Sequence, residues 1–181
     1  LVQRGAHLVA SRLVGDVRAQ HAVHQTIDDQ IALGLTREGR GHRLIEREGV
    51  RVIFPRGQSC CGQPADNSGF PGGARAVARR QIRAFHEDIP IVVPSGSCAG
   101  MMKHHYPTLF AGATDQAEAE RFAARVFEWS EFMVRVLGVR LEDRGQPLKV
   151  TWHTSCHALR EMRVIEDSKS LIRQLSNVEL V

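Results

Sequence analysis

The chain has 181 residues, of which 43% are hydrophobic and 24% are charged, and these proportions are typical of a soluble globular protein. A chain of this length forms one ordinary domain, or one domain together with part of another. The net charge is +4, but the arginines are scattered and a single tyrosine is available for stacking on bases, so we expect no nucleic-acid partner.

The apolar segments are too short for a membrane protein. No run approaches the ~20 residues that a spanning helix needs, and no segment has the apolar core of a signal peptide. We therefore expect a cytoplasmic protein that does not span a membrane. In that compartment thiols stay reduced, so four cysteines indicate metal or redox chemistry rather than structural disulfides.

The first 41 residues have the weakest pattern of the chain, and we treat 1–41 as a separate N-terminal segment. Apolar residues recur at every fourth position from Ala19 to Ile31. This spacing predicts a helix over residues 17–33.

The next stretch predicts a strand, a helix and a second strand. Alternating apolar residues over 50–54 indicate a short strand that Pro55 ends. An apolar stripe over 74–86 predicts an amphipathic helix, and the apolar run 89–93 predicts a buried strand. A helix that connects two strands forms a βαβ unit, in which the strands are parallel.

Further along the chain the periodicity predicts mostly helices. We expect a short helix over 101–110 that Pro107 interrupts, and one long helix over 115–137. A strand is predicted over 148–152 and a final helix over 167–181. The alternation of strands and helices places the chain in the α/β class.

The cysteines follow the predicted strands. Cys60 and Cys61 are adjacent, and two neighbouring side chains face one object only on an irregular turn, which the following Gly62 and Pro64 favour. Cys98 comes directly after the predicted strand 89–93. The carboxyl ends of parallel strands are where open α/β sheets bind ligands, so we predict that these three sulfurs converge on one pocket.

The fourth thiol repeats this arrangement, because Cys156 follows the predicted strand 148–152. All four cysteines are thus predicted to lie on loops at the carboxyl ends of strands.

Three motifs resemble a known family: Ser-Cys-Cys-Gly-Gln-Pro at 59–64, Gly-Ser-Cys-Ala-Gly-Met at 96–101 and His-Thr-Ser-Cys-His-Ala-Leu-Arg-Glu at 153–161. They are similar to motifs of the cysteine-rich CCG-domain iron–sulfur proteins, and within that group to the lactate-utilisation iron–sulfur subunit. Its relatives include the glycolate oxidase iron–sulfur subunit and the CCG-containing subunit of heterodisulfide reductase. The resemblance implies a Rossmann-like parallel sheet of βα units.

The same resemblance implies a division of the chain. Residues 42–140 match a first CCG domain, and 141–181 match the start of a second, truncated CCG repeat. A second Cys-Cys-Gly motif does not follow, so we expect a chain that is incomplete at both ends relative to the family.

The resemblance also implies a ligand set. Cys60 and Cys61 match the Cys-Cys-Gly pair, and Cys98 matches the first cysteine of the family's closing Cys-x-x-Cys motif, whose last position is Met101 here. Cys156 matches the cysteine that opens the second motif. In heterodisulfide reductase such motifs hold noncubane 4Fe–4S clusters, so a 4Fe–4S cluster on these cysteines is implied.

The implied function is that of an electron-transfer subunit in a complex that oxidises L-lactate to pyruvate, with the other subunits of that complex as partners. No general base, flavin fingerprint or substrate arginine can be assigned, so we expect a subunit of an oxidoreductase rather than a catalyst that acts alone. Two alternatives stay open. The same thiols would also select zinc, in a zinc- or thiol-stabilised interaction module, or the chain is an inactive fragment of such a subunit.

Overall fold

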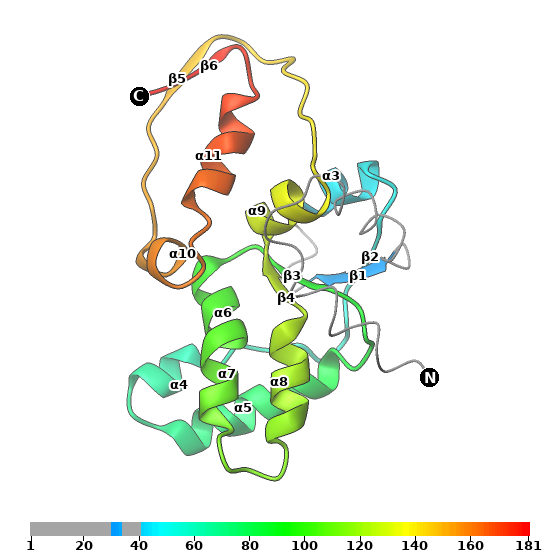
Figure 1. Cartoon of the computed structure of the whole chain (residues 1–181), viewed down its shortest axis with the longest axis vertical. Helices are drawn as coiled ribbons and strands as arrows, with labels where there is room; N and C mark the ends of the chain where they lie inside the picture. The colour runs from blue at the N-terminus through cyan, green and yellow to red at the C-terminus, as the bar shows by residue number, and fades with distance from the viewer. Residues whose placement is uncertain (1–29, 34–40) are drawn as a thin grey trace.

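The computed structural model describes residues 30–33 and 41–181 (Figure 1). Its first element is strand β1, Gln30–Leu33. The helix predicted over 17–33 is therefore wrong for its last four residues, and 17–29 lie outside the described residues. Strand β1 is paired on both sides, and such tertiary pairing overrides a local helical spacing.

The larger sheet has four parallel strands in the order β2-β1-β3-β4. The other strands are β2 (Arg51–Ile53), β3 (Ile91–Val93) and β4 (Val126–Glu128). Every residue of β3 is fully buried, as expected for a strand that is covered on both faces. The α/β class and the two strands predicted around residues 52 and 91 are confirmed.

Three helices lie between the first strands: α3 (Gly41–Arg47), α4 (Gln63–Asn67) and α5 (Pro71–Ala84). The helix predicted over 74–86 is α5, which starts three residues earlier because proline is well tolerated in a first helical turn. The apolar face of α5 includes Ala74, Ala78 and Ile82, which are buried in the same cluster as Ile91 and Val93 of β3.

The single long helix predicted over 115–137 is wrong. The structure has α8 (Gln116–Ala124), strand β4, α9 (Trp129–Glu131) and a π-helical turn, η2 (Phe132–Val136). Pairing with β3 interrupts the helix: the Ile91 amide donates to the Arg125 carbonyl at 2.8 Å, at the start of the β3–β4 ladder. A three-residue buried strand fits the apolar spacing of residues 115–137 as well as a continuous helix does. The periodicity of the sequence therefore could not distinguish a single helix from a helix followed by a strand.

The helix predicted over 101–110 is present but begins earlier. Helices α6 (Gly96–Gly100), η1 (Met101–His105, π-helical) and α7 (Tyr106–Leu109) follow one another directly along the chain. Pro107 lies in the first turn of α7, where its missing N–H and fixed φ are tolerated.

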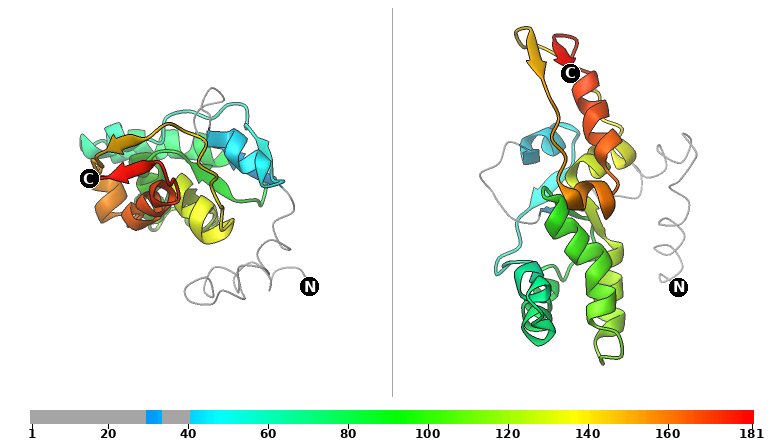
Figure 2. Two further views of the ribbon diagram at one scale, coloured as in Figure 1. Left: turned by 90° about the horizontal axis from the view of Figure 1, so that it is seen from above. Right: turned by 90° about the vertical axis from the view of Figure 1, so that its left-hand side faces the viewer.

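The C-terminal segment contains β5 (Leu148–Val150), α10 (Cys156–Arg160), α11 (Ile165–Arg173) and β6 (Val178–Leu180). Strands β5 and β6 form a separate two-stranded parallel sheet (Figure 2). The helix predicted over 167–181 is wrong beyond Arg173. The Leu148 amide donates to the Asn177 carbonyl and the Val181 amide to the Val150 carbonyl, so the last residues pair with β5 instead.

Two apolar clusters cover the two faces of the larger sheet. Ile91 and Val93 belong to one cluster and Val92 to the other, as the alternation of side chains along a strand requires. Met162 and Val164 join the first cluster and Leu171 the second, so the C-terminal segment is packed against the larger sheet's layers. Among the described helices, none is both long and apolar enough to cross a membrane.

Candidate functional site

The paired thiols lie on the loop that joins β2 to α4. Cys60 and Cys61 directly precede Gly62, which caps α4 with a φ of +89°. A β-carbon at Gly62 would also lie 3.1 Å from the Ala74 carbonyl oxygen. Glycine is required here for two reasons, the left-handed backbone and the close approach of the loop to α5. The predicted irregular turn at the cysteine pair is confirmed.

The other two cysteines lie in helices, so the prediction that all four are on loops is wrong for Cys98 and Cys156. Cys98 is in the first turn of α6, and Cys156 is the first residue of α10. Ser95 and Ser155 have extended backbone and directly precede the two helices, so each helix starts immediately after the extended segment. The Ser155 hydroxyl accepts a hydrogen bond from the Ala158 amide at 3.2 Å, which is a typical N-cap contact.

Two of the thiols are close enough to shift each other's pKa. Cys61 is buried, with 2% of its surface exposed, and the interacting thiol is that of the half-buried Cys98, as a side-chain hydrogen-bonding partner. This hydrogen bond, and then burial, raise the pKa of Cys61. The same hydrogen bond lowers the pKa of Cys98 to about 6, against the effect of burial and with the help of the Ser95 and Ser97 hydroxyls. At neutral pH the pair thus holds one thiolate, on Cys98.

Cys60 lies beside this pair on the exposed side of the loop. Its sulfur accepts a hydrogen bond from the Gly62 amide at 3.5 Å. The pKa of Tyr106 is raised first by burial and then by the charges of Cys61, Cys60 and Cys98. The three sulfurs are therefore within electrostatic range of one phenol. Within residues 30–33 and 41–181, however, no group of three or more His, Cys, Asp or Glu side chains is arranged to hold a metal ion.

Cys156 is exposed on a neighbouring helix and does not contribute to the pKa shifts of Cys61 or Cys98. Its helix α10 is packed closely against α6. A methyl group at Gly96 would lie 2.9 Å from the Ala158 β-carbon and 3.0 Å from the Ala158 backbone nitrogen. The structure thus brings the helix of Cys156 to that of Cys98 without bringing the fourth thiol into contact with the others.

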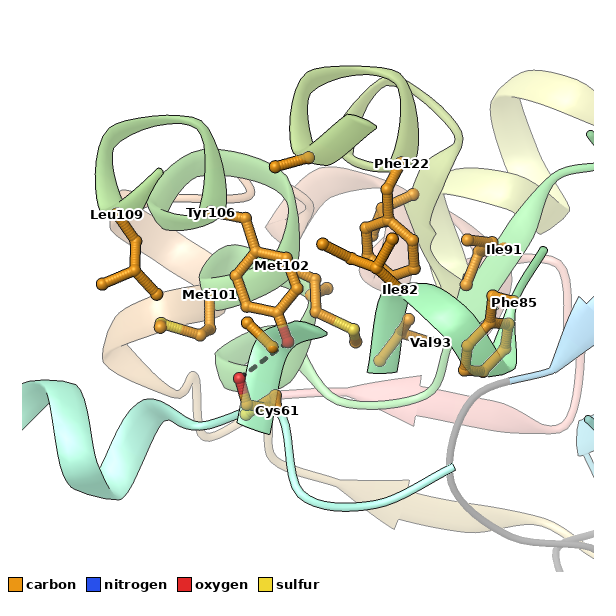
Figure 3. Packing of buried hydrophobic residues seen from close by; sticks show 14 of the residues in the cluster. Cys61, Ile82, Phe85, Ile91, Val93, Met101, Met102, Tyr106, Leu109 and Phe122 are labelled. Atoms are coloured by element: carbon orange, nitrogen blue, oxygen red, sulfur yellow. Dashed lines mark hydrogen bonds between the residues drawn. The ribbon is translucent and has the colours of Figure 1, made fainter. Parts of the chain in front are cut away.

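Two buried polar side chains hold the cysteine loop, and sequence reasoning missed both. The Tyr106 hydroxyl donates to the Cys61 carbonyl at 2.8 Å (Figure 3). The Gln81 Oε1 atom accepts from the Ser59 amide at 2.8 Å. The available signals were a glutamine on the apolar stripe of α5 and the single tyrosine of the chain.

Histidine and carboxylate side chains also connect segments that adjoin the cysteines. Glu161 Oε1 lies 2.8 Å from Nδ1 of His157 and 3.5 Å from Nε2 of His105. His105 in turn lies 3.9 Å from Asp66 on α4. This cluster connects α4, η1 and the end of α10.

The donor chemistry of the site fits a metal or an iron–sulfur cluster. Thiolates are ligands for both, and Cys98 is ionised at neutral pH. The Gln81 Nε2 group is buried and has no hydrogen-bond partner among the described residues. Buried N–H donors are nearly always hydrogen-bonded, so an unpaired one beside the cysteine loop is unusual. Such a donor could form a hydrogen bond to the sulfur of a bound cluster.

One segment of the chain matches a known protein family. Residues 38–103 match the cysteine-rich domain family, CCG. This region includes the cysteine pair and Cys98, and it ends before Cys156. No solved structure gives a significant match.

The chain is also similar to curated proteins from bacteria. It is 43% identical over 141 residues to lactate utilization protein A of Geobacillus kaustophilus (strain HTA426), covering 76% of this chain and 58% of the relative. For lactate utilization protein A of Bacillus velezensis the values are 44% over 140 residues, 76% and 58%. Lactate utilization protein A 2 of Bacillus cereus (strain Q1) is 39% identical over 138 residues, with 76% and 57% covered. The chain thus spans about 58% of the length of the relatives it matches. Residues 38–103 match the cysteine-rich CCG family that the motifs resemble, and over three quarters of its length the chain is similar to lactate utilization protein A.

Proposed function

We propose that this chain is the iron–sulfur electron-transfer part of a system that oxidises L-lactate to pyruvate. The relatives are named for lactate utilization, and the matched family is cysteine-rich. The observation on which the proposal depends is that the Cys61 and Cys98 thiols shift each other's pKa, with Cys60 next to Cys61 in the same loop. Iron–sulfur clusters are held by several cysteine thiolates, and three cysteines of this chain lie on neighbouring segments.

In this proposal Cys60, Cys61 and Cys98 hold a 4Fe–4S cluster, and Cys156 or a group from outside the chain is the remaining ligand. A bound cluster would accept and pass on one electron at a time. Gln81 and Tyr106 hold the backbone on either side of the cysteine pair, so they orient the two thiols. The unpaired Gln81 N–H is a donor available to cluster sulfur, and such hydrogen bonds tune the reduction potential.

Lactate oxidation removes two electrons and two protons, whereas a cluster takes one electron. The chain therefore needs partner subunits that hold the substrate and a two-electron centre, and we propose a cytoplasmic oxidoreductase complex. We also propose a Rossmann-like first CCG unit over 42–140 and the start of a second over 141–181. The repetition of a strand, a serine and a cysteine-bearing helix in β3–α6 and β5–α10 supports this division.

The proposal is tested by purifying the chain without oxygen and measuring iron, acid-labile sulfide and visible absorption. We expect a brown protein that loses iron and colour in Cys61→Ser and Cys98→Ser, whereas Ser176→Ala at an exposed position retains both. Cys156→Ser then separates two ligand sets, because it loses iron only if this thiol is the fourth ligand.

A colourless protein that binds one zinc ion would replace the proposal with a zinc-stabilised interaction module. A colourless protein without metal, in both the wild type and the variants, would leave the chain as an inactive fragment of such a subunit.

A further inference from the structure

A cavity whose lining includes none of the cysteines lies between η1, η2 and the residues at the end of α10. Its volume is about 480 Å³, which is in the range of small-molecule sites. Met162 contributes a buried apolar surface, and four cationic side chains line it: Lys103, Arg135, Arg160 and Arg163. Glu131 and Glu161 also line the cavity, so four cationic side chains face two carboxylates and the lining is basic on balance.

Two of these four cations are neutralised inside the protein. Lys103 lies 3.3 Å from both carboxylate oxygens of Glu131. Arg135 forms a two-pronged pair with Asp167, at 3.1 and 2.6 Å. These contacts hold the walls of the cavity in place and leave little cationic charge of Lys103 or Arg135 for a ligand.

The other two cations have no such partner. The guanidinium groups of Arg160 and Arg163 form no hydrogen bond or ion pair with any residue that the structure describes. Both side chains are exposed and line the same cavity, Arg160 as the last residue of α10 and Arg163 in the turn that follows it. Their charges are thus available to whatever enters it.

The backbone at Arg163 adds an independent observation. Its φ is +54°, and no other non-glycine residue of the described chain has a positive φ. The turn closes α10, with the Val164 amide donating to the Ala158 carbonyl at 3.1 Å, and it lets Met162 and Val164 both enter the core. Glycine is the residue that suits this conformation, so the fold needs the turn but does not need an arginine in it.

We infer that this cavity is a binding site for a small molecule with a carboxylate or phosphate group, held by Arg160 and Arg163. Guanidinium groups bind these oxyanions in a two-pronged geometry, and unpaired ones at a cavity are suited to that role. Arg163 has a backbone conformation that glycine would adopt more easily, and its side chain has no partner among the residues that the structure describes. Strained residues of this kind are concentrated at ligand-binding sites. The inference does not depend on a cluster at the thiols.

The test is a calorimetric titration of the full chain with inorganic phosphate and, separately, with L-lactate. We expect saturable binding of at least one, and the stronger probe identifies which oxyanion the natural ligand has. Arg163→Gly should weaken binding about tenfold, the typical effect of losing one charge-assisted contact, without lowering Tm. Arg160→Gln should weaken it similarly, whereas Arg140→Ala, an exposed arginine outside the cavity, should not.

Two results would overturn the inference. One is the absence of saturable binding of both probes to the folded wild-type chain. The other is binding that is the same in Arg160→Gln, Arg163→Gly and the wild type. Iron content is measured on the same samples, so a failure here is distinguishable from a failure of the iron–sulfur proposal.

Discussion

Two parts of the molecule have the same order of elements, a strand followed by a serine and a cysteine-bearing helix, but they differ in how they are packed. In the first, strand β3 leads through Ser95 to the helix of Cys98, and in the second, strand β5 leads through Ser155 to the helix of Cys156. Strand β3 is fully buried between two neighbours, whereas β5 has a single neighbour and Leu148 is 58% exposed. The order of strand, serine and helix determines where each cysteine lies along the chain. The packing around that segment determines whether its thiol comes close to the other thiols.

The difference extends to the backbone of the two thiol segments. Tyr106 and Gln81, both buried, hold the cysteine pair that faces Cys98. The hydrogen bonds that residues 152–155 form with their side chains are short-range and exposed, such as the Trp152 Nε1 bond to the Thr154 hydroxyl. We therefore expect the first region to be sensitive to small changes and the second to tolerate them.

The largest effect is expected in the ionisation of Cys98. Its pKa is lowered from 9.0 to about 6, so thiolate reactivity should rise as pH increases through 6 and be nearly constant above pH 7. Stopped-flow alkylation of the metal-free protein, with Cys98 identified by mass spectrometry, measures this profile. Cys61→Ala removes the main cause of the shift, so its midpoint should move upward by more than ~1 unit. An unchanged midpoint in that variant would contradict the effect of Cys61 on the ionisation of Cys98.

The contact between the two regions gives the next largest effect. Gly96→Ala places a methyl group against the backbone of Ala158 and should lower the free energy of unfolding by about 2 kcal/mol. Gly72→Ala in α5 is the matched control, because nothing lies within 4 Å of its new methyl group. That variant should gain about 0.5 kcal/mol. Urea denaturation of both proteins measures the difference, and equal stabilities would show that α6 and α10 are not in contact.

A smaller effect is expected at the anchor of the cysteine loop. Tyr106→Phe leaves the buried Cys61 carbonyl without its donor and should cost about 1 to 2 kcal/mol of unfolding free energy. Trp152→Phe removes one exposed hydrogen bond of the second region and should cost less than ~0.5 kcal/mol. If Tyr106→Phe and Trp152→Phe lowered the free energy of unfolding by similar amounts, the two regions would not differ in their sensitivity to substitution.

The smallest effect is expected on the outer sheet. Lys149 and Glu179 are partners across β5 and β6, with Nζ and Oε2 2.8 Å apart and side chains that are 73% and 56% exposed. Solvent screens such pairs, so Lys149→Ala should change the free energy of unfolding by less than ~0.5 kcal/mol. A loss above ~1 kcal/mol in urea denaturation would mean that this sheet is more important to stability than its exposure suggests.

The sequence was sufficient for the features that depend on local chemistry. These are the turn at Gly62, the amphipathic helix α5 and the apolar strand β3. It failed at β4 and β6, because three residues are too few to establish a strand period when the flanking residues continue a helical one. Pairing with distant strands determines these segments, and no local pattern records it.

The sequence predicted that Cys60, Cys61 and Cys98 lie on neighbouring segments, and the structure has Cys61 and Cys98 close enough to shift each other's pKa. That these cysteines hold a cluster stays a prediction. The anchoring contacts of Gln81 and Tyr106 span 22 and 45 residues of sequence, so they follow only from the three-dimensional fold. The unequal ionisation of Cys61 and Cys98 likewise depends on which sulfur is buried.

The π-helical turn η1 has a consequence for how the thiol pair is aligned. It separates Cys98, at the start of the helical run, from Tyr106, whose hydroxyl holds the Cys61 carbonyl. A π-helical turn contains about one residue more than an α-helical turn, and the rotation per residue is correspondingly smaller than the ~100° of an α-helix. The wide turn therefore accommodates an additional residue while the helical faces before and after it keep their relative direction. An insertion within Met101–His105 that lacked this widening would rotate Tyr106 away from the Cys61 carbonyl, so the π-helical turn preserves the alignment of the tyrosine with the cysteine loop.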